Sequence, residues 1–166
     1  QLLQSLREMQ LKSIYDTQVY LKKEILKNYC KDDFNLNNLF IAVQCIDNDE
    51  IYTTIYTEFN DLEDALNCCI ASSNIPFITG IWDSTYKNKF SLDGGFSIDP
   101  FLNLKSSLEI SPDMWNKDNI KRSKQENFYK MFFYNNNINY HKLYIDGYND
   151  ARLNNYSIYA SLNDNF

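Results

Sequence analysis

A short segment, Phe90-Ser91-Leu92-Asp93-Gly94-Gly95, joins a predicted strand to two of the four glycines in the chain. Residues 90–92 predict the strand, and Asp93 leaves it at its end. Two adjacent glycines allow a tight turn at backbone angles that other residues avoid, and they allow the main chain to approach a ligand closely. A buried carboxylate leaving a sheet needs hydrogen-bond donors to stay ionised. Asp93 is therefore suited to orient or activate a partner group, and the alternative is an aspartate that caps a tight turn.

Upstream of this segment the sequence predicts a β-hairpin. Residues 39–46 are nearly all apolar, which suits a strand covered on both faces. Residues 51–57 are rich in β-branched and aromatic side chains and predict the next strand. The acidic segment 47–50 between them is predicted to be a turn rather than a calcium site, because it lacks the glycine and the spacing of an EF-hand loop.

The next predicted element is a helix that begins near Asn60. Asn60 is the expected N-cap, and Glu63 stands where a capping box places its acidic residue. Pro76 bars continuation of the helix. Cys68 and Cys69 are expected to be buried, unreactive thiols. The side chains expected to face inward are Leu62, Ala65, Leu66 and Cys69.

The rest of the chain predicts mainly helices. Apolar residues at spacings of three and four predict helical structure over residues 2–29. Residues 108–110 predict a short strand, and residues 123–134 and 140–153 predict two further helices. No internal repeat or linker divides the 166 residues, so we expect one domain or part of one.

Composition narrows the function classes. Sixteen basic and twenty-two acidic side chains give a net charge of −6, which argues against nucleic acid as the main partner. No apolar run approaches the length of a membrane span. The four cysteines form no CxxC pair, which favours a reduced, intracellular setting. We predict neither a metal nor a cofactor.

Several segments together resemble the patatin-like phospholipases, most of all the branch that contains the adipose triglyceride lipases. In that family a helix ends in a small-residue Ile-Pro turn, a loop follows, and a strand then ends in Asp-Gly-Gly. A later helix carries a Gly-Tyr-x-Asp pattern. The matching segments are Tyr56–Leu66, Cys68–Gly80, Tyr86–Phe90, Leu92–Ser97 and Ile145–Ala151.

The resemblance implies a three-layer α/β hydrolase fold that is incomplete in this chain. It implies hydrolysis of acyl esters in glycerophospholipids or acylglycerols by a Ser–Asp dyad. Asp93 stands at the position of the dyad carboxylate, and Gly94 and Gly95 shape its turn. The implied partners are a lipid substrate or membrane surface, and the implied location is peripheral to membranes or lipid bodies.

The chain departs from the family at the nucleophile. None of its glycines brackets a serine as Gly-x-Ser-x-Gly, and the glycines of the oxyanion hole are missing. The resemblance therefore places the serine on an upstream segment or a companion chain, which folding and activity would both need. Residues 1–166 then form the C-terminal part of one patatin-like domain, with a helical lead-in at 1–38, a family-like region at 39–155 and a tail at 156–166. Residues 98–100 read Ile-Asp-Pro where many relatives have asparagines before the proline.

Two questions stay open at this level. An apolar segment with Ile75, Phe77, Ile78 and Trp82 suits the lining of an acyl cleft or a contact with lipid, and equally suits core packing. The missing nucleophile also leaves an alternative function, a catalytically inactive patatin-derived scaffold or a lipid-binding or structural subunit. A third hypothesis is a virion or assembly protein in which the domain serves interaction only.

Overall fold

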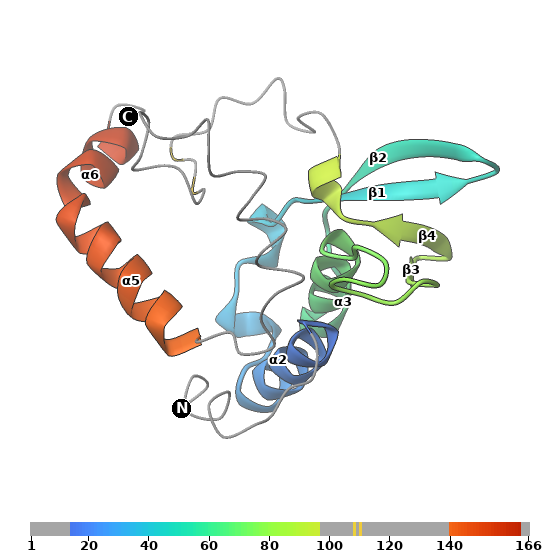
Figure 1. Ribbon diagram of the computed structural model, residues 1–166, viewed down its shortest axis with the longest axis horizontal. Coiled ribbons are helices and arrows are strands. Elements are labelled where there is room, and N and C mark those ends of the chain that lie inside the picture. The colour runs from blue at the N-terminus through green and yellow to red at the C-terminus, as the bar shows by residue number, and fades with distance from the viewer. Residues whose placement is uncertain (1–13, 97–107, 109, 111–139, 164–166) are drawn as a thin grey trace. The chain divides into compact units, whose positions relative to one another are not determined.

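The computed structural model describes residues 14–96, 108, 110 and 140–163 (Figure 1). The chain divides into two compact units, of which one contains residues 14–96 and the other contains residues 140–163. Each unit is described by itself. The first holds a sheet and its covering helices, and the second is represented by two helices.

In the part of the chain that the structure describes, the sheet has four strands in the order β2-β1-β4-β3, and every neighbouring pair is antiparallel. The strands are β1 (Ile41–Asp47), β2 (Glu50–Tyr56), β3 (Thr85–Tyr86) and β4 (Lys89–Leu92). The predicted hairpin of β1 and β2 and the predicted strand before Asp93 are both confirmed. Asn48 and Asp49 connect β1 to β2 with positive φ angles, as a two-residue hairpin loop requires.

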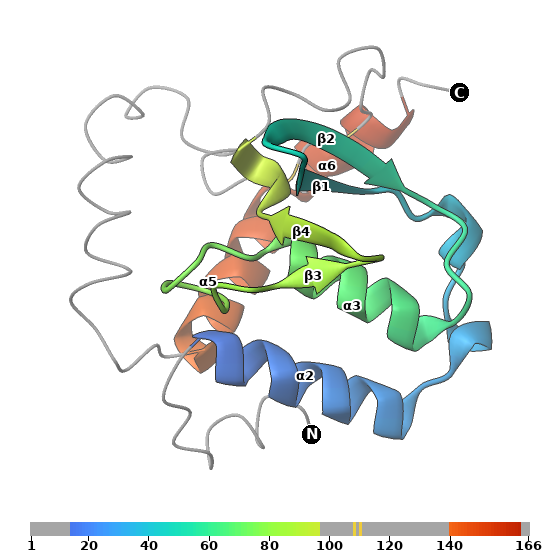
Figure 2. The same ribbon diagram turned by 90° about the vertical axis from the view of Figure 1, so that its right-hand side faces the viewer.

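Helices lie against one side of this sheet. They are α2 (Ile14–Asn28), the short 3-10 helices η1 (Lys31–Asp33) and η2 (Leu36–Asn38), and α3 (Leu62–Ser72). In both Figure 1 and Figure 2, α3 lies between the sheet and α2. The Lys22 ammonium of α2 donates to Glu63 at 2.7 Å and to Asn67 at 2.8 Å, so it links α2 to α3.

The core forms between α3 and the adjacent face of β1. Val43 and Cys45 of β1 are fully buried, and so is Cys68 of α3. The buried residues of α3 recur every third position, as Leu62, Ala65, Cys68 and Ala71. The predicted inward face is therefore wrong for Cys69, which is exposed, while Leu66 is half-buried.

The start of α3 also differs from the prediction by one residue. Asp61 is the N-cap, and its Oδ1 accepts a hydrogen bond from the Asp64 N–H at 2.8 Å. Asp64 reciprocates, because its Oδ2 accepts from the Asn60 N–H at 3.1 Å. Glu63, the predicted capping-box residue, instead forms an ion pair with Lys22. The helix thus has aspartates at both capping positions, where they favour its positive end.

The second unit contributes α5 (Tyr140–Leu153) and α6 (Asn155–Asn163). The predicted helix over 140–153 is confirmed, and α6 occupies most of the predicted tail. Leu108 and Ile110 stand outside any strand, so the short strand predicted there is wrong at these positions. The helices predicted over residues 2–13 and 123–134, and the segment 98–100, lie outside the described residues. Among the helices that the structure describes, none is long and apolar enough to cross a membrane.

The described residues therefore define a mixed helix-and-sheet protein, which agrees with the expected class at its coarsest level. The sheet is antiparallel throughout, and α3 lies against one of its faces. The candidate site lies at the end of β4, where the chain passes from the sheet into Asp93.

Candidate active-site turn at the end of β4

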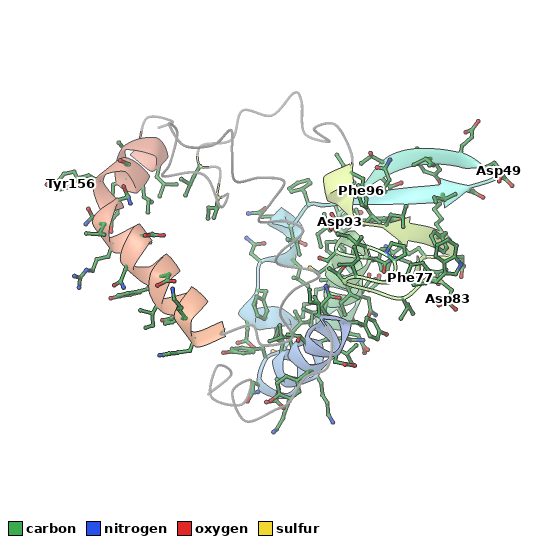
Figure 3. The ribbon with its side chains drawn as sticks, viewed as in Figure 1. Asp49, Phe77, Asp83, Asp93, Phe96 and Tyr156 are labelled. Atoms are coloured by element: carbon green, nitrogen blue, oxygen red, sulfur yellow. The ribbon has the colours of Figure 1, made fainter. Side chains whose placement is uncertain are left out.

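Asp93 follows the last residue of β4 and is half-buried. The chain then turns through the 3-10 helix η3 (Gly94–Phe96), beside which Asp93 is labelled in Figure 3. The Gly95 N–H donates to Oδ1 of Asp93 at 2.7 Å, and the Phe96 N–H donates to the Asp93 carbonyl at 3.1 Å. Within the described residues, Oδ2 of Asp93 accepts no hydrogen bond. The turn therefore holds the carboxylate through one oxygen.

A second residue, Asn74, fixes the main chain at this point. The Asn74 carbonyl accepts a hydrogen bond from the Asp93 N–H at 2.8 Å. The Asn74 side chain donates from Nδ2 to the Ser91 carbonyl, also at 2.8 Å, and Asn74 is only 1% exposed. Asn74, the second residue after α3, is thus bonded to the chain on both sides of Leu92. Sequence reasoning missed Asn74; its one sequence signal is a polar residue directly before the apolar Ile75-Pro76.

Glycine is required at position 94 because there is no room for a side chain, and not because the backbone angles demand it. A Cβ at this position would lie 2.1 Å from the carbonyl oxygen of Ala42 in β1 and 3.2 Å from Oγ of Ser72. Ser72 itself donates to that carbonyl at 2.7 Å. No glycine in the described ranges has a positive φ, so the expectation of unusual angles in this turn is wrong. The close approach that glycine permits is what brings the turn against β1.

The four predicted cleft residues separate into two groups. Ile75 and Ile78 are half-buried, whereas Phe77 is 81% exposed and Trp82 is 63% exposed. The rings of Phe77 and Trp82 stack, with centroids 5.3 Å apart and planes inclined by 20°. Trp82 also meets the edge of Phe90 at 6.2 Å. Core packing is therefore wrong for Phe77 and Trp82, which form an exposed aromatic pair.

The loop that carries this pair is tied down by its own main chain. The Ile75 carbonyl accepts hydrogen bonds from the N–H groups of Ile78, Thr79 and Gly80, at 3.0, 3.0 and 3.2 Å. Oγ1 of Thr79 accepts from the Ile75 N–H and donates to the Ser73 carbonyl. Gly80 packs against the Asn74 side chain so closely that any Cβ would overlap it. The loop and the Asp93 turn therefore share Asn74 as a common support.

The ionisable groups near the start of α3 form a separate cluster. The Tyr86 hydroxyl donates to Oδ1 of Asp64 at 2.7 Å, and the Lys87 ammonium lies 4.0 Å from Oδ2. Burial acts to raise the pKa of Asp64, but these two contacts and the Asn60 N–H outweigh it and hold the pKa below its ordinary value. Burial also raises the pKa of the nearby Cys68 thiol to about 12. The expectation of an unreactive thiol therefore fits Cys68, although exposed Cys69 is not buried as expected.

Comparisons with known proteins assign this chain to no family. No protein-family model, curated protein or solved structure matches this chain. Across the described residues, no group of three or more histidines, cysteines, aspartates or glutamates is arranged to hold a metal ion.

Proposed function

We propose that this chain is part of a lipid acyl ester hydrolase, a phospholipase or acylglycerol lipase, in which Asp93 is the carboxylate of a Ser–Asp dyad. The supporting observation is the half-buried carboxylate at the end of β4, held through Oδ1 by the Gly95 N–H at 2.7 Å. A fixed carboxylate with a second oxygen for a serine hydroxyl is what such a dyad needs. The sequence resemblance to patatin-like phospholipases supplies the substrate class.

The proposed chemistry uses each oxygen of Asp93 for one task. Oδ1 keeps the carboxylate oriented through Gly95, and Oδ2 accepts the proton of the serine hydroxyl as the serine oxygen bonds to the acyl carbon. The alcohol of the ester leaves with that proton. Water then attacks the acyl-enzyme, which releases the fatty acid and restores the serine. No histidine, metal or cofactor enters this sequence.

The serine itself belongs, in this proposal, to an upstream segment or a companion chain. None of Gly80, Gly94, Gly95 and Gly147 brackets a serine at nucleophile-elbow spacing. The same missing part would supply the oxyanion donors and complete the patatin-like α/β fold. The enzyme would act at membranes or lipid bodies inside the cell, as a peripheral protein.

The test combines covalent labelling with one substitution. Native, uncut protein is treated with a fluorophosphonate, and the adduct is mapped to a peptide. We expect a labelled serine in a glycine-flanked peptide outside residues 1–166. Asp93→Asn and Asp93→Ala should abolish ester hydrolysis, while Asp32→Asn, which alters an exposed carboxylate of η1, should leave it unchanged. Retained ester hydrolysis by folded Asp93→Asn protein would contradict the assignment of Asp93 to the dyad.

A second function is favoured by one observation, the absence of Gly-x-Ser-x-Gly from all 166 residues. A patatin-derived scaffold that has lost its nucleophile would serve as a lipid-binding or structural subunit, or as an assembly protein. The labelling experiment separates the two functions. No adduct on folded, complete protein would favour the inactive scaffold.

A further inference from the structure

The sheet carries a continuous apolar row on the face opposite α3. Ile41, Val43 and Cys45 of β1 belong to the core, so the alternating residue Ile46 points to the other face. Ile46 pairs with Ile51 of β2 and with Phe90 of β4. Trp82 meets Phe90, and Phe77 stacks on Trp82. We name this set the aromatic row; it consists of Ile51, Ile46, Phe90, Trp82 and Phe77.

The aromatic row is open to solvent at both ends. Ile51 is 63% exposed, and Trp82 and Phe77 are exposed at the other end, while Ile46 and Phe90 between them are half-buried. Single exposed apolar side chains are common, but a connected row of them on one face marks an interaction site. The row therefore has the form of a docking surface.

The protein presents Phe77 outward against local preference. Phe77 has a φ of 66°, a left-handed conformation that is rare for a bulky side chain. The three hydrogen bonds to the Ile75 carbonyl hold the loop in this state. Strain retained at an exposed aromatic residue is typical of functional positions. A rigid loop also reduces the entropy lost when the residue binds.

Charges around the aromatic row indicate what can cover it. Asp49 and Glu50 precede Ile51 at one end, Asp83 follows Trp82 at the other, and all three are exposed. The nearby lysines contact aromatic rings on the α3 face of the sheet. The Lys89 ammonium lies 5.1 Å from the centroid of the Tyr52 ring, and the Lys87 ammonium lies 5.4 Å from that of Tyr86. Acidic ends disfavour an anionic membrane and also a second copy of the same acidic surface. They favour a surface whose outermost groups are cations.

We propose that the aromatic row docks on a membrane surface rich in phosphatidylcholine. The outermost group of this lipid is a quaternary ammonium, which aromatic faces bind by cation–π attraction and which carboxylates complement in charge. Tryptophan is also the side chain most suited to the membrane–water boundary. The proposal rests on the proposed function, since it names the lipid surface at which that hydrolase would act. Docking itself does not involve Asp93.

The test measures vesicle binding by the full chain. The sequence contains two tryptophans, so Trp115→Phe leaves Trp82 as the only one. We expect vesicles of phosphatidylcholine alone to sediment the protein, to shift Trp82 emission to shorter wavelength and, when brominated, to quench it. Replacing part of the phosphatidylcholine by phosphatidylserine should weaken binding. Sedimentation of the unsubstituted chain controls for any effect of Trp115→Phe.

Variants identify the surface. Phe77→Ala with Trp82→Ala should weaken sedimentation at least about tenfold, because two large apolar side chains no longer leave water. Tyr156→Ala removes an 89% exposed aromatic residue on α6 and should change nothing. Asp83→Lys should shift the preference towards vesicles with phosphatidylserine. Circular dichroism establishes that each variant is folded.

Three outcomes would overturn the proposal. They are no binding of folded protein to phosphatidylcholine vesicles, tighter binding to vesicles with phosphatidylserine, and self-association that disappears in the Phe77→Ala, Trp82→Ala variant. Asp93→Asn protein should bind vesicles as the unsubstituted chain does. In native, uncut protein, vesicle binding without hydrolysis would therefore contradict only the proposed function, and hydrolysis of dispersed substrate without vesicle binding would contradict only the docking surface.

Discussion

The carbonyl of Asn74 and the N–H of Asp93 are joined by a hydrogen bond of 2.8 Å, which ties the second residue after α3 to the residue that follows β4. The Asn74 side chain adds a second bond, to Ser91. The main chain that leads into the candidate carboxylate is thus positioned by a residue with no proposed chemical role.

Removing the Asn74 side chain should destabilise the sheet unit. Asn74→Ala leaves the buried Ser91 carbonyl without its donor, which costs about 1–3 kcal/mol in the free energy of unfolding. Asn67→Ala is the matched control, because Asn67 is exposed and its partner Lys22 retains Glu63. Urea unfolding of both variants measures the difference. Equal stability of the two variants would contradict the positioning role of Asn74.

Adding a single methyl group should have opposite effects at two glycines. Gly94→Ala would place Cβ 2.1 Å from the Ala42 carbonyl oxygen, so the turn must move away from β1 and we expect a loss of several kcal/mol, of order 2–4. Gly147 lies within α5 and has open space around it, so Gly147→Ala should stabilise that helix by about 0.5–1 kcal/mol. Thermal unfolding of both variants provides the comparison. A Gly94→Ala protein as stable as the parent would show that the turn does not need its approach to β1.

Acid should remove the contribution of Asp64 to stability. Its pKa in the folded protein lies below the ordinary value of 3.8, so its contribution is complete above that value and is lost as the pH falls through the folded pKa. Tyr86→Phe removes the hydroxyl that donates to Asp64 at 2.7 Å and should cost about 1.5–3 kcal/mol at neutral pH. The difference between parent and variant should shrink below about pH 4. Urea unfolding at neutral pH and at about pH 3 checks this, and a difference independent of pH would count against it.

The four thiols should divide into two pairs. Cys30 and Cys69 are exposed, whereas Cys45 and Cys68 are buried. Burial also raises the pKa of Cys68 to about 12, which leaves almost no thiolate at neutral pH. An aromatic disulfide reagent should therefore label two cysteines in the folded chain and four after unfolding, with peptide mapping to identify them. Rapid labelling of Cys68 in the folded state would show that the α3 face is open.

Local signals in the sequence predicted most of the secondary structure in the described ranges. A nearly continuous apolar run at 39–46, β-branched and aromatic residues at 51–57 and an acidic turn at 47–50 sufficed to predict β1 and β2. The exact start of α3 was missed because Asn60, Asp61 and Asp64 are all good capping residues. Glu63 is not available for capping because it pairs with Lys22 of α2, a contact between distant segments that the local sequence does not reveal. The exposure of Cys69 was missed for a related reason, since the buried face of a helix depends on how it lies on the sheet.

The site was predictable only in part. Asp93 and its glycines stood out as a rare local pattern, but the reason for Gly94 lies in β1, more than forty residues earlier, where Ala42 leaves no room for a Cβ. The exposure of Phe77 likewise could not be predicted, because the sequence pattern of an apolar run does not distinguish a buried segment from an exposed one. Contacts between distant segments decide both cases.

Helix α3 is attached to the β3–β4 hairpin near both of its ends. Near its start, Asp64 holds Tyr86, and just beyond its end Asn74 holds Ser91 and Asp93. An element bonded at both ends cannot loosen by fraying from one of them, so α3 and β4 should open together or not at all. Their amide protons should then exchange with solvent at one common free energy. Asp93 would keep its place on the sheet for as long as the helix is formed.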